Sequence, residues 1–320
     1  MKAVIQTTYG SPDKLHIKEI SKPAPKKREV LVRVKATAVN DYDWSMVRGE
    51  PKIYRLMFGI LRPKTLLGME LAGIVEACGA GVENFKEGDE VFGDTSDHGF
   101  GSFAEFMCVH EDALVKKPIQ LTFAQAAATP HASMLAIQAL KDIAKIKQNQ
   151  KILINGAGGG VGSFALQYAK LFGAIVTGVD SSDKLASMTA LGFDQVISYQ
   201  QDDFTKGQHS YDIILDAKTN RSAFRYLNCL KRQGVYVTVG GFLPKLLQVL
   251  LCGPVFRWLF KKNLRVLALK ANKGLTEISD LLTSEQLKCP IEGPFSLEEA
   301  PKAIQYFGDA KHKGKVVISL

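Results

Sequence analysis

The spacing of apolar and polar residues changes along the chain. Residues 1–123 contain short segments in which the two alternate, such as 30–39, separated by glycine- and proline-rich turns. From residue 122 the apolar positions take helical spacing, and short apolar runs then alternate with further helical segments. Residues 290–320 predict an extended segment, a helix over 297–307 and a closing strand over 315–320. The pattern therefore predicts a β-rich domain joined to an α/β domain.

The α/β part contains the apolar runs that a parallel sheet buried on both faces requires. A helix of about three turns, with Phe164, Tyr168 and Leu171 on one face and Gly173 as its cap, separates the first two runs. We expect six strands in a doubly wound sheet. They are predicted at 152–154, 175–177, 196–197, 211–216, 235–239 and 266–269.

A glycine-rich segment joins the first of these runs to its helix. Ala157, Gly159 and Gly162 match the dinucleotide motif G-x-G-x-x-G, with alanine in the first place. Small residues permit the tight turn, the approach of a pyrophosphate to the backbone and close packing of helix on sheet. The helix N-terminus would bind the pyrophosphate, and Asp180, eighteen residues after Gly162, would accept hydrogen bonds from the ribose hydroxyls. The weaker alternative to dinucleotide binding is a glycine-rich turn that serves only the packing of helix on sheet.

Composition narrows the class of protein. An apolar content of 46% with 23% charged residues is typical of a soluble globular chain, and the N-terminal residues already form a strand pattern. The five cysteines are scattered without C-x-x-C pairs, which favours a reducing cytoplasm over a disulfide framework or a structural zinc knot. The net charge is +9, and we interpret the lysines as spread over a solvated surface rather than as a nucleic-acid site.

Three separated segments resemble one family. They are GMELAGIVEACGAGVENFKEGDEVFG at 68–93, NGAGGGVGSFALQYAKLFGA at 155–174 and HKGKVVISL at 312–320. With the domain order, they resemble the zinc-independent quinone oxidoreductase branch of the medium-chain dehydrogenase/reductase superfamily. The resemblance implies a chaperonin-10-like β-barrel catalytic domain at 1–123 and 287–320. It also implies a Rossmann NAD(P)-binding domain with a six-stranded sheet at 124–286, and a cofactor bound between the two.

The positions that hold catalytic zinc in related alcohol dehydrogenases are altered here. Asn40 stands where a cysteine is expected, Met69 replaces the ligand histidine beside Glu70, and an ungapped alignment places the third ligand at His131. An amide, a thioether, one carboxylate and one imidazole are a poor tetrahedral zinc set. We therefore expect no catalytic zinc and no structural zinc.

Without a metal, hydrogen-bond donors must stabilise the negative charge that develops on the hydride acceptor. By resemblance, the candidates are Asn40 and Tyr42, with His131 as a general acid. Tyr42 has the alternative of packing against Trp44, and His131 that of a structural histidine. Asp43 is predicted to fix this segment as a hydrogen-bond acceptor. Leu135 replaces a threonine that touches the nicotinamide in the family, and Thr129 or Ser133 are possible substitutes.

The cofactor is predicted to be NADPH or NADH, with the preference open. Asp180 repels a 2′-phosphate and favours NADH, whereas the residues after it, and the family's more frequent choice, favour NADPH. The predicted cofactor-binding residues are Asn155, Gly156, Ala157, Gly158, Gly159, Gly160, Val161, Gly162, Asp180, Ser181, Ser182, Lys184, Gly240 and Gly241.

Residues 242–260 form the most apolar stretch of the chain. Pro244, Lys245, Gly253-Pro254 and Arg257 interrupt it, so a transmembrane span is not expected. We interpret it as a pair of short helices that cover the substrate cleft or a subunit interface. An interfacial membrane helix is the second interpretation.

Together these features predict a cytoplasmic, zinc-independent NAD(P)H-dependent oxidoreductase that passes hydride to a quinone, enone or activated carbonyl. The resemblance also implies a homodimer joined through the edge strand of the sheet. The alternative is a non-catalytic dinucleotide-binding protein that contacts RNA or a membrane surface, for which the basic charge is the supporting feature. The sequence does not name the acceptor, because fold does not determine substrate.

Overall fold

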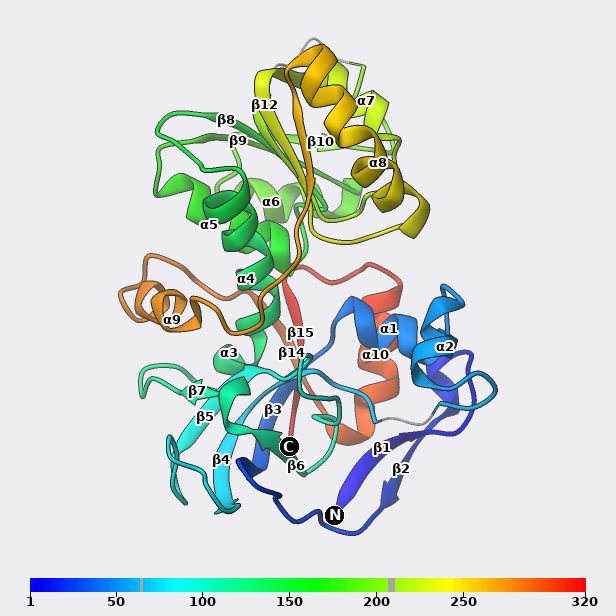
Figure 1. Ribbon diagram of the computed structural model, residues 1–320, viewed down its shortest axis with the longest axis vertical. Helices are drawn as coiled ribbons and strands as arrows, with labels where there is room; N and C mark the ends of the chain where they lie inside the picture. Colours follow the sequence, from blue (N-terminus) through cyan, green and yellow to red (C-terminus); the bar gives the residue numbers. More distant parts are fainter. Residues whose placement is uncertain (64–65, 207–210) are drawn as a thin grey trace. The chain divides into compact units, whose positions relative to one another are not determined.

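The computed structural model describes residues 1–63, 66–206 and 211–320, which pack into two compact units. The first unit comprises residues 1–131, 271–283 and 291–320, and the second comprises 132–270 and 284–290. These bounds differ from the predicted ones, because the first unit extends to His131 and also includes 271–283 (Figure 1).

The first unit is built on strands whose side chains are largely buried in β3, β4, β5 and β15 and alternate in β6. A sheet with the order β14-β15-β3-β4-β5-β7, in which β6 also pairs with β3, lies beside a β1-β2 hairpin. All of its pairings are antiparallel except β14 with β15. The strands are β1 (Lys2–Gln6), β2 (Leu15–Glu19), β3 (Glu29–Ala38), β4 (Glu70–Cys78), β5 (Glu90–Asp94), β6 (Phe106–His110), β7 (Val115–Lys116), β14 (Ile291–Ser296) and β15 (Lys315–Ser319).

Helices cover this sheet where the chain between strands is long enough. Thr122 caps α3 with its hydroxyl, which accepts a hydrogen bond from the backbone N–H of Gln125 at 3.2 Å. The helix predicted over 297–307 begins with a 3₁₀ turn capped by Ser296 and continues as α10. The helices of this unit are α1 (Asp41–Arg48), α2 (Ile53–Phe58), α3 (Phe123–Ala128), α9 (Leu275–Thr283) and α10 (Ala300–Gly308).

The second unit has the predicted doubly wound sheet of six strands. All five pairings are parallel, in the order β10-β9-β8-β11-β12-β13. Five strands lie where the apolar runs predict them, and the sixth lies three residues earlier, at 263–266 rather than 266–269. The strands are β8 (Lys151–Asn155), β9 (Ile175–Asp180), β10 (Gln195–Ser198), β11 (Tyr211–Asp216), β12 (Leu230–Thr238) and β13 (Asn263–Val266).

Helices flank both faces of this sheet (Figure 1). Gly173 has the left-handed φ of 63° expected of a cap, although α5 ends two residues earlier, at its C-cap Leu171. The pair of short helices predicted over 242–260 is wrong, because Pro254 is accommodated inside one continuous helix, α8. The helices are α4 (Pro130–Ile137), which starts in the first unit, α5 (Gly160–Lys170), α6 (Leu185–Leu191), α7 (Ala223–Cys229) and α8 (Leu243–Phe260).

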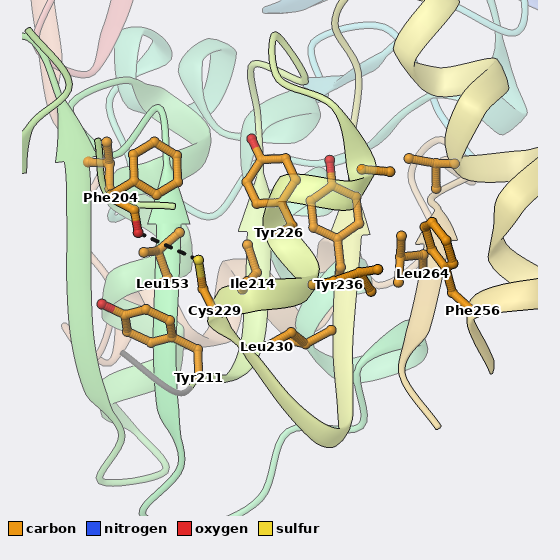
Figure 2. Close-up of a cluster of buried hydrophobic side chains, with 14 residues drawn as sticks. Leu153, Phe204, Tyr211, Ile214, Tyr226, Cys229, Leu230, Tyr236, Phe256 and Leu264 are labelled. Carbon is orange, nitrogen blue, oxygen red and sulfur yellow. Dashed lines mark hydrogen bonds between the residues drawn. The ribbon is translucent and has the colours of Figure 1, made fainter. Parts of the chain in front are cut away.

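A cluster of aromatic and aliphatic side chains joins the helices to the sheet of the second unit (Figure 2). Tyr226 of α7 and Tyr236 of β12 are fully buried, with ring centroids 4.6 Å apart. Phe256 of α8 and Leu264 of β13 belong to the same cluster. Burial of this many large side chains fixes the inner face of α8 against the sheet.

Candidate active site

Helix α1 begins directly after β3 and carries the first group of predicted site residues. Asn40 is its N-cap, and the Asp43 carboxylate accepts the backbone N–H of Asn40 at 2.9 Å. The same carboxylate accepts the N–H of Gly68 at 2.8 Å. The prediction that Asp43 fixes this segment is confirmed, although the segment is a helix start. Burial raises the pKa of Asp43 to about 7, against its backbone hydrogen bonds.

The Asn40 side chain is held by its own unit. Its amide nitrogen donates to Glu70 Oε1 at 2.9 Å and to the carbonyl of Ala38 at 3.2 Å, and its amide oxygen accepts from Lys315 Nζ at 2.6 Å. Both donor hydrogens therefore have protein partners. This geometry makes Asn40 a positioning residue, and its donation to a substrate stays a prediction.

Glu70 and Lys315 form a buried ion pair beneath this segment. Lys315 Nζ donates to Glu70 Oε1, and the two side chains are 4% and 0% exposed. The other Glu70 oxygen accepts the backbone N–H of His131 at 2.9 Å. The pair therefore connects β4, β15 and the first turn of α4, and it fixes the backbone of His131.

His131 is oriented by a second carboxylate. Its Nδ1 lies 2.8 Å from Asp94 Oδ2 at the end of β5. Burial raises the pKa of Asp94, but the hydrogen bonds from His131 and Ser96 outweigh burial and leave that pKa below its ordinary value. An ionised Asp94 favours the tautomer with hydrogen on Nδ1, which leaves Nε2 for a substrate.

Tyr42 lies beside this imidazole. The two rings meet edge to face, with centroids 6.1 Å apart, and Tyr42 also contacts Tyr54 and Phe100. Among the residues described, none hydrogen-bonds the Tyr42 hydroxyl, and the side chain is partly exposed. Burial of the ring and the charges of Asp94 and Asp97 raise its pKa, so the hydroxyl keeps its proton at neutral pH. A protonated hydroxyl is a donor.

The structure thus brings the predicted residues Asn40, Tyr42 and His131 together within one unit, and their catalytic roles stay predictions. It adds Asp94 and Lys315, which sequence reasoning missed. Lys315 lies in the C-terminal segment that carries the family resemblance, but nothing in that segment indicates that this lysine pairs with Glu70. Asp94 ends a strand without a motif of its own, so only the fold reveals it.

The residues at the zinc positions do not fit a metal. Met69 is buried in the core, both Glu70 oxygens have partners, and Nδ1 of His131 is bound to Asp94. In the described part of the chain, no three His, Cys, Asp or Glu side chains form a group that suits a metal ion.

Thr129 and Ser133, the possible substitutes for the threonine that contacts the nicotinamide in the family, are buried. Thr129 is fully buried and its hydroxyl donates to the carbonyl of Gln125 at 2.7 Å. Ser133 is also fully buried within α4, and Leu135 is 9% exposed. Neither hydroxyl is presented at the protein surface.

The glycine loop between β8 and α5 has the geometry of a phosphate cradle. Gly156 has a φ of 84°, which an L side chain rarely adopts. A Cβ at position 162 would lie 2.3 Å from the carbonyl oxygen of Ala157, so only glycine permits this close packing. Gly159 is the N-cap of α5 and has no side chain to cap the first N–H groups, which suits an anion.

Asp180 turns toward this loop. Its Oδ2 accepts the backbone N–H of Gly158 at 2.8 Å, and its Oδ1 accepts the N–H of Ser181 at 2.9 Å. Lys184 Nζ lies 3.9 Å from Asp180 Oδ1, and the side chains of Lys184 and Asp180 are 3% and 8% exposed. Ser182 is bonded to Ser198 through the two hydroxyls, at 2.7 Å. Asp180, which disfavours a 2′-phosphate, and Lys184, which favours one, are therefore neighbours.

Three further predicted cofactor residues lie at the carboxyl ends of β8 and β12, on either side of β11. Asn155 ends β8 and donates to Asp216 Oδ1 of β11 at 2.8 Å. Gly240 and Gly241 follow β12 with φ values of 156° and 121°. In doubly wound sheets, ligands bind at this edge. The second unit is therefore a dinucleotide-binding domain in its geometry, and NAD(P)H fits its loop.

Comparisons with known proteins agree with this class. Residues 26–119 match the model of the alcohol dehydrogenase GroES-like domain, and residues 191–318 match that of a zinc-binding dehydrogenase. A 2-methylene-furan-3-one reductase of Solanum lycopersicum is 32% identical, over 99% of this chain and 79% of its own. An NADPH-dependent alkenal/one oxidoreductase of Arabidopsis thaliana is 30% identical, with the same coverage.

A solved structure is similar over the whole length. The quinone oxidoreductase from Coxiella burnetii has a TM-score of 0.88 at 28% identity, covering 100% of this chain and 99% of its own. The chain belongs to the medium-chain dehydrogenase/reductase superfamily, in its zinc-independent branch.

Proposed function

We propose that the protein reduces an enone or a quinone with hydride from NADPH, without zinc. That it is an NAD(P)H-dependent oxidoreductase follows from its family. The observation that carries the finer proposal is the contact of Tyr42 with a histidine oriented by Asp94, at the place where related enzymes bind zinc. This pair supplies proton donors in place of a Lewis acid.

The residues of the first unit have distinct roles in this proposal. NADPH, when bound, would supply the hydride that the β-carbon of an enone takes up, and negative charge would then develop on the carbonyl oxygen. Tyr42 and the imidazolium form of His131 donate hydrogen bonds to that oxygen, and one of them transfers a proton to it, which gives the enol. The enol then gains a proton at the α-carbon and loses its hydroxyl proton to give the saturated ketone. Asp94 stabilises the imidazolium, while Asn40, Glu70 and Lys315 hold the backbone of α1 and of His131 in place.

NADPH is favoured over NADH by the pairing of Asp180 with Lys184. The lysine ammonium partly neutralises the carboxylate that would repel a 2′-phosphate, and Ser181 follows directly. One relative of 30% identity is named for its dependence on NADPH. The non-catalytic alternative has no such support, because the relatives of highest coverage are named as reductases and oxidoreductases.

The test is the loss of nicotinamide absorbance with a panel of enones, quinones and simple aldehydes. We expect turnover with enones or quinones and NADPH, and much slower turnover with simple aldehydes. A Tyr42→Phe/His131→Ala variant that binds NADPH normally is the matched control. Tight NADPH binding without turnover of any acceptor would contradict the proposal and favour the non-catalytic alternative.

The homodimer and the cytoplasmic location expected from the sequence stay proposals. Strand β13 is the last in the order of the sheet, and in the described residues its outer edge pairs with no other strand. An unpaired edge favours pairing with a second copy. Light scattering at micromolar concentration should report twice the chain mass, and a single chain mass would reject the dimer.

A further inference from the structure

The excess of positive over negative charge falls in one segment of the chain. Residues 217–270 contain 11 of the 41 lysines and arginines and none of the 32 acidic residues. The rest of the chain therefore has 30 basic and 32 acidic residues, close to neutral. The lysines themselves are spread out, with 6 of the 31 in this segment, but the absence of acidic residues here places the net charge of +9 in this segment. It contains α7, β12, α8 and β13.

Helix α8 exposes an unusually apolar surface within that segment. Its inner face, with Val249, Gly253 and Phe256, is buried against the core of the second unit. The opposite face is apolar too, and Leu251 and Trp258 are 76% and 79% exposed. Exposed apolar side chains follow the helix at intervals of three and four residues. They are Leu243, Leu247, Leu250, Leu251, Val255, Trp258 and Leu259.

This helix is suited to lie on a membrane and not to cross it. By length and composition it passes the criteria for a membrane span, at 18 residues and a mean hydropathy of 1.3. However, its inner face is packed on Leu264 and the rest of the aromatic cluster, as Figure 2 shows for Phe256. Crossing a bilayer would remove that face from the core. A helix anchored in this way exposes only its outer face.

Basic residues flank the apolar face at its C-terminal end. Arg257 and Lys261 line a groove of about 630 Å³ between α8 and β13 from the helix, and Arg265 lines it from the strand. A second copy of the chain on this face would bring two sets of these cations together, with no carboxylate in the segment to offset them. A surface of negative charge complements both features.

We propose that α8 docks the protein on a bilayer rich in anionic lipid. The outer face of α8 inserts at the boundary of headgroups and acyl chains, and the flanking arginines and lysines bind the lipid phosphates. The proposal does not depend on the reaction that the protein catalyses.

Vesicle binding tests the proposal directly. Sedimentation with vesicles of phosphatidylglycerol and phosphatidylcholine should show binding that rises with the anionic fraction and weakens at high salt. Trp258 is one of only two tryptophans, so its emission should shift to the blue on binding. Trp258→Phe should lose this shift. Equal binding to pure phosphatidylcholine, or no binding to either vesicle, would overturn the proposal.

Variants separate the apolar and the charged contributions. Leu251→Gln should weaken binding about tenfold, and Arg257→Gln with Lys261→Gln about 25-fold, at roughly fivefold for each cation. The matched controls are Ile119→Gln, at a side chain 89% exposed in the first unit, and Lys86→Gln. Both should bind as the wild type does.

Light scattering on the same variants distinguishes a second copy from a membrane. If Leu251→Gln converts a dimer into a monomer, the apolar face is an interface between copies and the membrane proposal is wrong. If the variant keeps its oligomeric state and its affinity for NADPH while losing vesicle binding, the proposal is supported.

Discussion

The buried pair of Glu70 and Lys315 provides a quantitative prediction. Lys315→Met removes the cation and leaves the Glu70 carboxylate, with no exposed surface, against the backbone N–H of His131. Breaking a buried ion pair from one side costs about 3–5 kcal/mol, because the remaining charge is neither solvated nor neutralised. Domains have total stabilities of about 5–15 kcal/mol, so this loss is a large fraction.

Replacing both partners should recover most of that loss. In Lys315→Met/Glu70→Gln no charge is buried, and the glutamine oxygen can still accept one N–H, so we expect stability within about 1.5 kcal/mol of the wild type. The exposed pair of Lys311 and Asp309 is the matched control. Lys311→Met should cost less than about 1 kcal/mol.

Urea unfolding measures the effect in the first unit alone. In a Trp258→Phe background the fluorescence comes from Trp44, which packs in a core cluster of the first unit. With a slope of about 2 kcal/mol per M, Lys315→Met should lower the midpoint by roughly 2 M. A single variant that unfolds near the wild-type midpoint, or a double variant no more stable than the single one, would refute this role of the ion pair.

Four further predictions concern the site. Because burial raises the pKa of Asp43 to about 7, its protonated form stabilises the fold at low pH, and this contribution disappears as pH rises from about 4 to about 7. The stability difference between the wild type and Asp43→Asn, from urea midpoints, should follow that course, and a pH-independent difference would refute it. Tyr42→Phe should lower kcat by about 10²-fold with NADPH affinity nearly intact, whereas full activity would remove Tyr42 from the chemistry. His131→Ala should act more weakly than Tyr42→Phe and mostly at acidic pH, where an imidazolium is available to donate, so a uniform loss at all pH values would point to a structural role. Titration with both cofactors should show that Asp180→Ser shifts the preference toward NADPH and that Lys184→Gln shifts it toward NADH. If the ratio of NADPH affinity to NADH affinity is unchanged in both variants, neither side chain faces the ribose.

Much of the fold could be predicted from local sequence. Parallel strands that are buried on both faces must be continuous apolar runs, so five of the six strands were found in place. The sixth was misplaced because Val266 and the apolar residues after it continue the pattern beyond the end of pairing. Helix α8 was predicted as two pieces because Pro254 breaks most helices, and packing of its inner face overrides that preference.

The candidate site was predictable only in part. The glycine loop has a motif, because its geometry requires small residues at fixed spacing. The supporting network has none, because Asp94 and Lys315 reach the site from strands distant in the sequence. Such residues are of common types and meet only in the folded chain, so the sequence contains no periodic pattern that marks them. For the same reason Asn40 was interpreted as a free donor, although its amide is bound to Glu70 and Lys315.

The most direct test of the central claim is isotope transfer from the cofactor. The protein, treated with a chelator, is incubated with NADPH deuterated at the nicotinamide C4 and an enone, and the product is analysed by mass spectrometry. We expect one deuterium at the β-carbon, with an unchanged rate after chelation and a rate about 10²-fold lower in Tyr42→Phe. Product without deuterium, or a reaction that stops on chelation and returns with zinc, would contradict it.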